Sequence, residues 1–137
     1  AMGWHSRCGG AKELNTFVNC LLVGAGGMIG TVCRYLFGLL PIKAQSGFPV
    51  NTLLINIIGG FFMGLIIAFS EKNGNINPQL LLFLKIGICG GFTTFSTFSW
   101  EAVQLLQNGK FFTGLSYMVL SVALCVSAVA GAQAIVK

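Results

Sequence analysis

Four apolar stretches dominate this chain, and each is long enough to cross a lipid bilayer as a helix. A helix needs about 20 apolar residues to span the roughly 30 Å of hydrocarbon in a membrane. Only 8% of the residues are charged, against roughly 25% in ordinary soluble domains. The sequence therefore predicts an all-α integral membrane protein with four transmembrane helices in a single domain, residues 15–137. The stretches are Phe17 to Leu40, Phe48 to Ser70, Pro78 to about Gln107, and Phe111 to Val136.

The first 14 residues are polar and differ in composition from everything that follows. We expect this leader to be of vector origin, and it has no part in the predicted mechanism. The first apolar stretch is too long for a removed signal sequence and is not followed by a cleavage site and a soluble domain, so it is expected to stay in the protein. An even number of spans then places both termini on one side of the membrane.

The cysteines and the net charge exclude several other classes of protein. The five cysteines show no CxxC pattern and no histidine spacing, so they predict neither a disulfide framework nor a zinc site. We expect them to act as small packing residues. The formal charge of +5 comes from basic residues spread along the chain, which is no indication of nucleic-acid binding. The cysteines are Cys8, Cys20, Cys33, Cys89 and Cys125.

The lysines in the loops and at the carboxyl end are balanced between the two sides of the membrane. Without the leader, Lys72 and Lys137 fall on one side and Lys43 and Lys110 on the other. The positive-inside bias that sets orientation is therefore nearly absent. We expect the chain to insert both ways up in the lipid and to form an antiparallel homodimer about a two-fold axis. Four helices leave little room for an aqueous path, so transport is expected at the interface between the copies.

Two pairs of glycines have the spacing that lets helices approach closely in a membrane. Gly26 and Gly30 form one pair, and Gly60 and Gly64 form the other. Small residues at this spacing allow two backbones to pack together in lipid. The pairs predict either packing within one chain or a dimer interface, and the pattern does not distinguish the two.

The segment Gly90 to Phe98, GGFTTFSTF, is rich in glycine and hydroxyl groups inside the third apolar stretch. Non-helical or polar sequence at membrane depth survives only where protein or a water-filled cavity surrounds it. Glycine is a poor helix former, and threonine competes locally for backbone hydrogen bonds. We therefore expect the third helix to break near its middle. Freed carbonyls at such a break suit a hard cation such as Na⁺, whereas freed N–H groups and hydroxyls suit an anion.

Polar side chains of the second and last spans are candidates to line an ion path. Asn56 offers two N–H donors, which suit an anion whose hydration shell must be replaced. Hydrogen bonding between helices is an equally weighted alternative for this residue. Tyr117, Ser121 and Cys125 are spaced four apart, which places them along one stripe of a helix.

Four further residues near the break and the first span have distinct expected roles. Phe95 and Phe98 are three apart and share a helix face, so their ring edges, which carry partial positive charge, are able to attract an anion. Arg34 lies deep in the first span, and we expect it to have a structural role. Glu101 is the one carboxylate within a predicted span, and we expect it to be a surface acid that anchors a helix end.

These motifs resemble those of the small bacterial fluoride channels of the Fluc family. The resemblance covers residues 15–137. The matching features are Gly26-Gly27-Met28-Ile29-Gly30 with Arg34-Tyr35, the segment Asn51-Thr52-Leu53-Leu54-Ile55-Asn56-Ile57-Ile58-Gly59, and the GGFTTFSTF segment with Glu101 after it.

The resemblance implies a fluoride-selective channel of the inner (plasma) membrane rather than an enzyme. It implies an antiparallel homodimer with two pores along its interface, a structural Na⁺ at the dimer centre, and passive export of cytoplasmic fluoride. The carbonyls of Gly90 and Thr93 would bind the Na⁺. The pore residues it implies are Asn56, Phe95, Ser96, Thr97, Phe98, Tyr117 and Ser121.

Two other classes of protein compete with this interpretation. A small four-span multidrug exporter would share the size and the charge balance, but it is expected to need an acidic residue in its first span. Phe17 to Leu40 contains none. A membrane scaffold without transport activity does not explain Asn56 together with the polar segment.

Overall fold

The computed structural model describes residues 9–137, and side chains from Leu14 onward. The secondary-structure elements in this part of the chain are all helices, and the third span consists of four consecutive helical segments. The prediction of four helices with a broken third span is confirmed. The elements are α2 (Gly9–Gly38), α3 (Val50–Asn73), α4 (Pro78–Leu82), the π-helical segment η1 (Phe83–Cys89), α5 (Gly90–Phe92), α6 (Phe95–Gln107) and α7 (Phe111–Val136). The first helix thus begins at Gly9, inside the predicted leader; residues 1–8 lie outside the described part.

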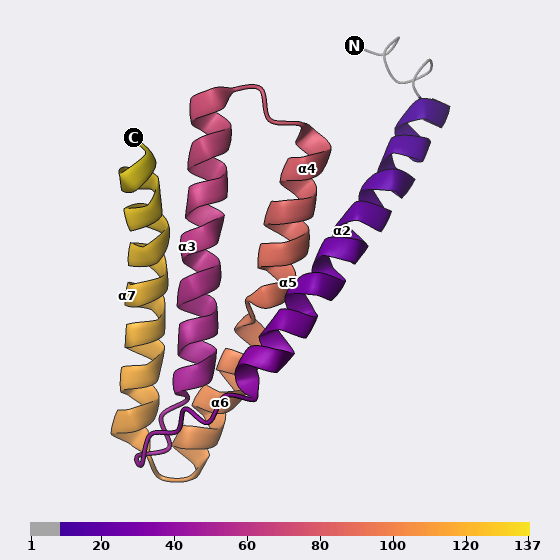
Figure 1. The fold of residues 1–137 in the computed structure, drawn as a ribbon. Helices are drawn as coiled ribbons and strands as arrows, with labels where there is room; N and C mark the ends of the chain where they lie inside the picture. Colours follow the sequence, from indigo (N-terminus) through magenta and orange to yellow (C-terminus); the bar gives the residue numbers. More distant parts are fainter. Residues whose placement is uncertain (1–8) are drawn as a thin grey trace.

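The helices run up and down between two ends of the molecule. The start of α2, the connection from α3 to α4 and the end of α7 lie at one end, and the other two connections lie at the opposite end (Figure 1). Helix α3 packs along α7, and α2 leans against η1 and α5. Within residues 9–137, four helices are long and apolar enough to cross a membrane. The chain is therefore a multi-pass membrane protein whose described ends share a side.

Glycines allow α2 to cross the third span in direct backbone contact. A Cβ atom on Gly26 would lie 2.6 Å from the Phe83 carbonyl oxygen, and one on Gly30 would overlap the Ile88 carbonyl oxygen. In the second pair, a Cβ atom on Gly64 would lie 2.6 Å from a carbonyl oxygen of α7. Both glycine pairs thus include close contacts within the chain, the first of the two alternatives that the sequence left open.

The break in the third span falls at two threonines. Thr93 (φ −76°, ψ 157°) and Thr94 (φ −149°, ψ 115°) are extended, whereas Gly90 and the following glycine are helical. The Thr94 hydroxyl oxygen accepts the Thr97 N–H at 3.2 Å and so caps the start of α6. The Thr93 hydroxyl donates to the Cys89 carbonyl at 2.9 Å. Local side-chain hydrogen bonds of this kind compete with the helix, so the threonines end one helix and start the next.

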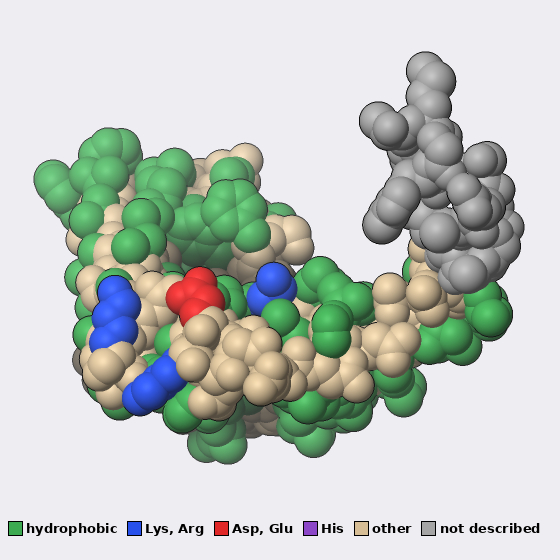
Figure 2. Space-filling model, turned by 90° about the horizontal axis from the view of Figure 1, so that it is seen from above, with side chains coloured by type: hydrophobic (Ala, Val, Ile, Leu, Met, Phe, Trp, Pro, Cys, Tyr) green, Lys and Arg blue, Asp and Glu red, His purple; other side chains and the backbone are tan. Residues whose placement is uncertain are grey.

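Little of the apolar surface is buried inside the chain. A compact cluster of Leu53, Ala102, Leu105 and Tyr117 joins α3, α6 and α7. Most large apolar side chains of α2 point outward, and apolar side chains cover much of the visible face of the molecule (Figure 2). In a membrane protein such a surface contacts lipid or another protein chain, because only these environments are as apolar as the side chains themselves.

Candidate functional site

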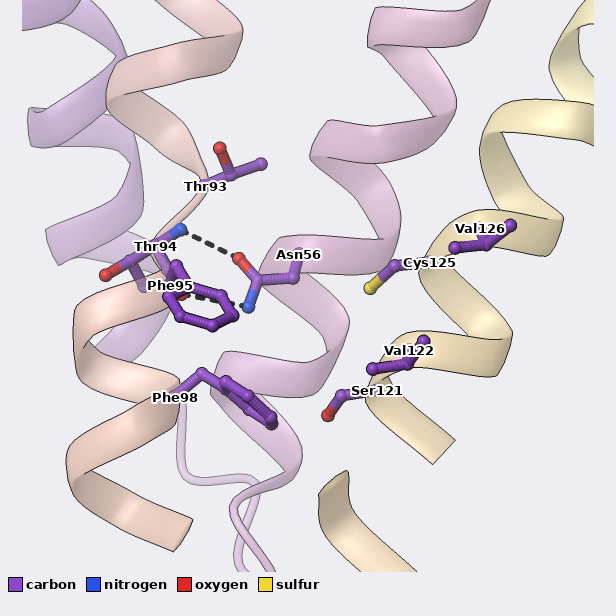
Figure 3. Close-up of a pocket in the computed structure, with 9 residues that line it drawn as sticks. All are labelled: Asn56, Thr93, Thr94, Phe95, Phe98, Ser121, Val122, Cys125 and Val126. Carbon is purple, nitrogen blue, oxygen red and sulfur yellow. Dashed lines mark hydrogen bonds between the residues drawn. The ribbon is translucent and has the colours of Figure 1, made fainter. Parts of the chain in front are cut away.

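The break is attached to α3 through the side chain of Asn56. Its Oδ1 accepts the Thr94 N–H at 2.8 Å, and its Nδ2 donates to the Thr94 carbonyl at 3.1 Å (Figure 3). The amide therefore replaces both helical hydrogen-bond partners of one extended residue. The helix-to-helix bonding that the sequence offered as an alternative role is present. Because an amide nitrogen carries two hydrogens, one donor is left for a ligand.

The same hydrogen bonds deprive two carbonyls of their usual donors. In a continuous α-helix the Thr94 N–H would donate to the Gly90 carbonyl, and the Thr97 N–H would donate to the Thr93 carbonyl. Here the first donates to Asn56 Oδ1 and the second to the Thr94 hydroxyl. Uncharged carbonyl oxygens are ligands that hard cations accept. The oxygens of Gly90 and Thr93 therefore form a donor set compatible with Na⁺.

A groove of about 340 Å³ opens beside the break, between the third span and α7. Figure 3 shows that side chains from three helices point into it. Four predicted pore residues gather here, namely Asn56, Phe95, Phe98 and Ser121. The remaining lining residues are Thr93, Thr94, Val122, Cys125 and Val126.

The two predicted phenylalanines stand next to each other at the groove. Their ring centroids are 5.5 Å apart and their planes are inclined by 46°. Phe98 is half-buried and packs against Tyr117 with the centroids 5.1 Å apart. Phe95 is 78% exposed, so its ring projects beyond the rest of the chain. The geometry offers the edges of both rings to an anion, and it leaves Phe95 free to contact a further molecule.

The hydroxyl of Ser121 is a buried group without a hydrogen bond among the described residues. The side chain is only 6% exposed, and its Oγ has no partner there. The hydroxyl points from α7 into the groove (Figure 3). A buried hydroxyl that makes no hydrogen bond costs about 1–3 kcal/mol. Ser121 is therefore the polar group of this wall most in need of a ligand.

Tyr117 does not line the groove. Its side chain is fully buried, with 0% exposed surface, and its hydroxyl donates to Glu101 Oε2 at 2.9 Å. Thr52 donates to the other oxygen of the same carboxyl group at 2.7 Å. The expectation that Glu101 is a surface acid at a helix end is wrong, because it lies in the middle of α6 and is held by hydrogen bonds from α3 and α7. Thr52 is four residues before Asn56 and therefore shares a helix face with it, but this spacing does not reveal the bond to Glu101.

A second, more polar cavity of about 510 Å³ lies on the other side of the break. It is bordered by α2, α3 and α6, and Arg34, Thr97 and Glu101 are among its lining residues. Thr94 lines both this cavity and the groove. Ser96 is exposed, with its hydroxyl 3.5 Å from that of Thr94. The predicted polar residues are thus divided between two sides of the broken helix, with Thr94, which the sequence did not single out as a site residue, between them.

Among the described residues, four helices can span a membrane and the third is broken beside a groove, an arrangement found in small multi-pass membrane transport proteins. Broken helices line ion and substrate sites in transport proteins because their free backbone groups replace water. Residues 21–133 match the family described as CrcB-like protein, Camphor Resistance (CrcB). The chain belongs to this family.

Individual relatives match over most of their length. The chain is 45% identical over 117 residues to a protein of Ruminiclostridium cellulolyticum, and the match covers 85% of this chain and 90% of the relative. It is 42% identical over 118 residues to a protein of Rhizobium meliloti, covering 85% and 94%. Both relatives are called fluoride-specific ion channel FluC. A protein of Methanosarcina barkeri, fluoride-specific ion channel FluC 3, is 52% identical over 90 residues, covering 66% and 68%.

Proposed function

We propose that this protein is a fluoride-specific ion channel of the plasma (inner) membrane, through which cytoplasmic fluoride leaves the cell by passive flow. The names of its relatives support this function, and the chain covers 90% or more of two of them. Conduction down a gradient needs no chemical turnover, so the protein is a channel and not an enzyme. A multidrug exporter, one of the competing classes, is expected to need an acidic residue in its first span, and Phe17 to Leu40 of this chain contains none.

The observation that carries this proposal is the set of donors around the groove. The free N–H of Asn56, the unpaired hydroxyl of Ser121 and the ring edges of Phe95 and Phe98 all border the same space. A channel conducts an ion when its lining replaces the hydration shell without holding the ion too tightly. Fluoride is small and strongly hydrated, so it requires strong donors at short range. The groove combines such donors with weaker ring edges.

The working form in this proposal is an antiparallel homodimer embedded in lipid. The groove is open on one side, and the Phe95 ring that borders it is 78% exposed. A second copy of opposite orientation would cover that side and convert each groove into a closed path. The outward apolar side chains of α2 are available for the same interface. Two pores would then follow the interface.

A Na⁺ ion at the dimer centre is the third part of the proposal. The carbonyls of Gly90 and Thr93, left without their helical donors, supply two oxygens per chain. A two-fold axis would double this set. The bound cation would supply positive charge that holds the two breaks together, and its role would be structural.

The remaining predicted pore residues occupy different positions along the proposed path. Ser96 and Thr97 belong to the segment beyond the break, where Thr97 lines the polar cavity that also contains Arg34. Tyr117 would not contact the ion. Its hydroxyl holds Glu101, which borders that cavity, and its ring packs against Phe98. In this arrangement Asn56 and Ser121 contact the ion directly.

The test is fluoride efflux from liposomes that contain the purified protein, recorded with a fluoride electrode. A potassium ionophore is added to start the flow, because a passive channel needs a counter-ion path before net efflux begins. We expect fast, ionophore-dependent fluoride release and little chloride release from matched chloride-loaded vesicles. Liposomes without protein control for leakage. No fluoride release from demonstrably folded protein, or equal release of chloride, would overturn the proposal.

A further inference from the structure

Cys125 is the residue of the α7 stripe to which the proposed fluoride path gives no role. It lies one helical turn beyond Ser121 and is half-buried in the wall of the groove. Its sulfur points from α7 toward Asn56 on the opposite wall (Figure 3). The side chain is a free cysteine. A free thiol therefore faces the space that the ion is proposed to cross.

The neighbouring Ser121 independently indicates that this wall receives a ligand. Its side chain is more than nine-tenths buried, and its Oγ lacks a hydrogen-bond partner among the described residues. Val122 and Val126, which border the groove beside the two polar residues, offer no polar atoms of their own. Cys125 lies one helical turn from Ser121 on α7. An ion or a small polar molecule bound to the Ser121 hydroxyl would therefore lie close to the Cys125 sulfur.

We propose that Cys125 is a modification site at which small, thiol-specific electrophiles close the ion path. The inference rests on the proposed function, since it requires that the groove carries the ion. The groove has a volume of only about 340 Å³ and is bordered by two phenylalanine rings. A methylthio group added to the sulfur would extend toward Asn56, because the thiol already points there. It would occupy the space between the donors with an apolar group.

The reaction with methyl methanethiosulfonate illustrates the chemistry. The Cys125 thiol first loses its proton to water, since the thiolate is the nucleophile. The thiolate attacks the sulfenyl sulfur of the reagent and forms a new S–S bond to the methylthio group. The bond between that sulfur and the sulfonyl group breaks, and methanesulfinate leaves with the electron pair. An added dithiol reverses the modification by thiol–disulfide exchange.

The other described cysteines are placed where modification would leave the groove open. Cys20 and Cys33 are exposed on α2, and neither lines the groove. Cys89 is buried in η1 and is also absent from the lining. The matched control is Cys125→Ser, which removes the thiol and keeps a small polar side chain in the stripe. All other cysteines are left in place in both proteins.

The experiment compares fluoride efflux from liposomes before and after treatment with methyl methanethiosulfonate. Each protein is referred to its own untreated flux, and peptide mass spectrometry identifies the labelled cysteines. We expect the unmodified sequence to lose most of its flux when Cys125 is labelled and to recover it after dithiothreitol. Cys125→Ser should keep its own flux under the same treatment.

Three results would overturn the inference. Labelling of Cys125 without loss of flux would show that the thiol lies off the ion path. Labelling of Cys33 but never of Cys125 in the folded protein would show that reagents do not reach the groove. Equal loss of flux in Cys125→Ser would assign the effect to another cysteine. Failure of the channel function itself is distinct, because it is seen as absent fluoride flux before any reagent is added.

Discussion

Asn56 and Thr94 are joined by two hydrogen bonds of opposite direction, at 2.8 Å from the Thr94 N–H and at 3.1 Å to its carbonyl. A single amide side chain thereby satisfies the backbone of an extended residue inside the membrane. Both residues also line the groove. The bond pair that stabilises the break therefore also fixes the Asn56 amide at the wall of the groove, beside the proposed ion path.

Replacing Asn56 by aspartate should abolish most fluoride flux. Aspartate keeps an acceptor for the Thr94 N–H but loses the donor to its carbonyl, and its negative charge repels an anion. Loss of the bond to a buried carbonyl should also cost about 1–3 kcal/mol of unfolding free energy. Flux in liposomes and thermal unfolding in detergent measure the two effects. Asn73→Asp, at the exposed end of α3, is the control, and flux equal to that of this control would remove Asn56 from the path.

The ring-edge interaction is tested by Phe95→Ile and Phe98→Ile. Isoleucine retains apolar bulk but has no aromatic edge, so both variants should conduct fluoride more slowly while size-exclusion chromatography shows an intact assembly. Phe98→Ile should also lower the unfolding temperature, because that ring packs on Tyr117. Phe112→Ile, at an 82% exposed ring on α7, is the control. Normal flux in both groove variants would show that ring edges do not attract the ion.

The Tyr117 hydroxyl is predicted to stabilise the fold through Glu101. Tyr117→Phe removes the donor at 2.9 Å and leaves one carboxyl oxygen without it, which should lower the unfolding free energy by about 1–3 kcal/mol. Tyr117→Phe and Thr52→Val should not be additive, because both donate to the same carboxyl group. Tyr35→Phe, at an exposed ring on α2, should unfold like the unmodified protein. Additive effects of the first two would show that the shared carboxyl does not couple them.

The crossing of α2 over the third span should tolerate no side chain at Gly30. Gly30→Ala places a methyl group against the Ile88 carbonyl oxygen, and overpacking of this kind costs about 1–3 kcal/mol. Gly24→Ala changes the same helix at a position with no atom within 4 Å and should be neutral or slightly stabilising, since alanine is the better helix former. The measurement is the midpoint of thermal unfolding of the two variants in detergent, which should be lower for Gly30→Ala. Equal midpoints would contradict the crossing geometry.

The spans and the broken helix could be predicted from the sequence, because length, apolarity and local helix propensity act over neighbouring residues. The exact site of the break could not. The helix continues through Gly90 and ends at Phe92, since Gly91 packs closely against Gly27 of α2 and the two threonines that follow form hydrogen bonds nearby. Of the predicted site, Asn56, Phe95, Phe98 and Ser121 lie together at one groove, whereas Tyr117 is buried behind it.

The sequence by itself determined that this chain crosses the membrane four times, because each apolar stretch has the length that lipid requires and few charges to prevent insertion. It also determined that polar groups lie within the third span. The tertiary structure alone decided what those groups do. The Thr94 carbonyl accepts a hydrogen bond from the Asn56 amide, 38 residues away in the sequence, and Glu101 accepts one from the Thr52 hydroxyl, 49 residues away. Hydrogen bonds between helices depend on how the helices are packed, and that arrangement is not visible in the spacing along any one of them.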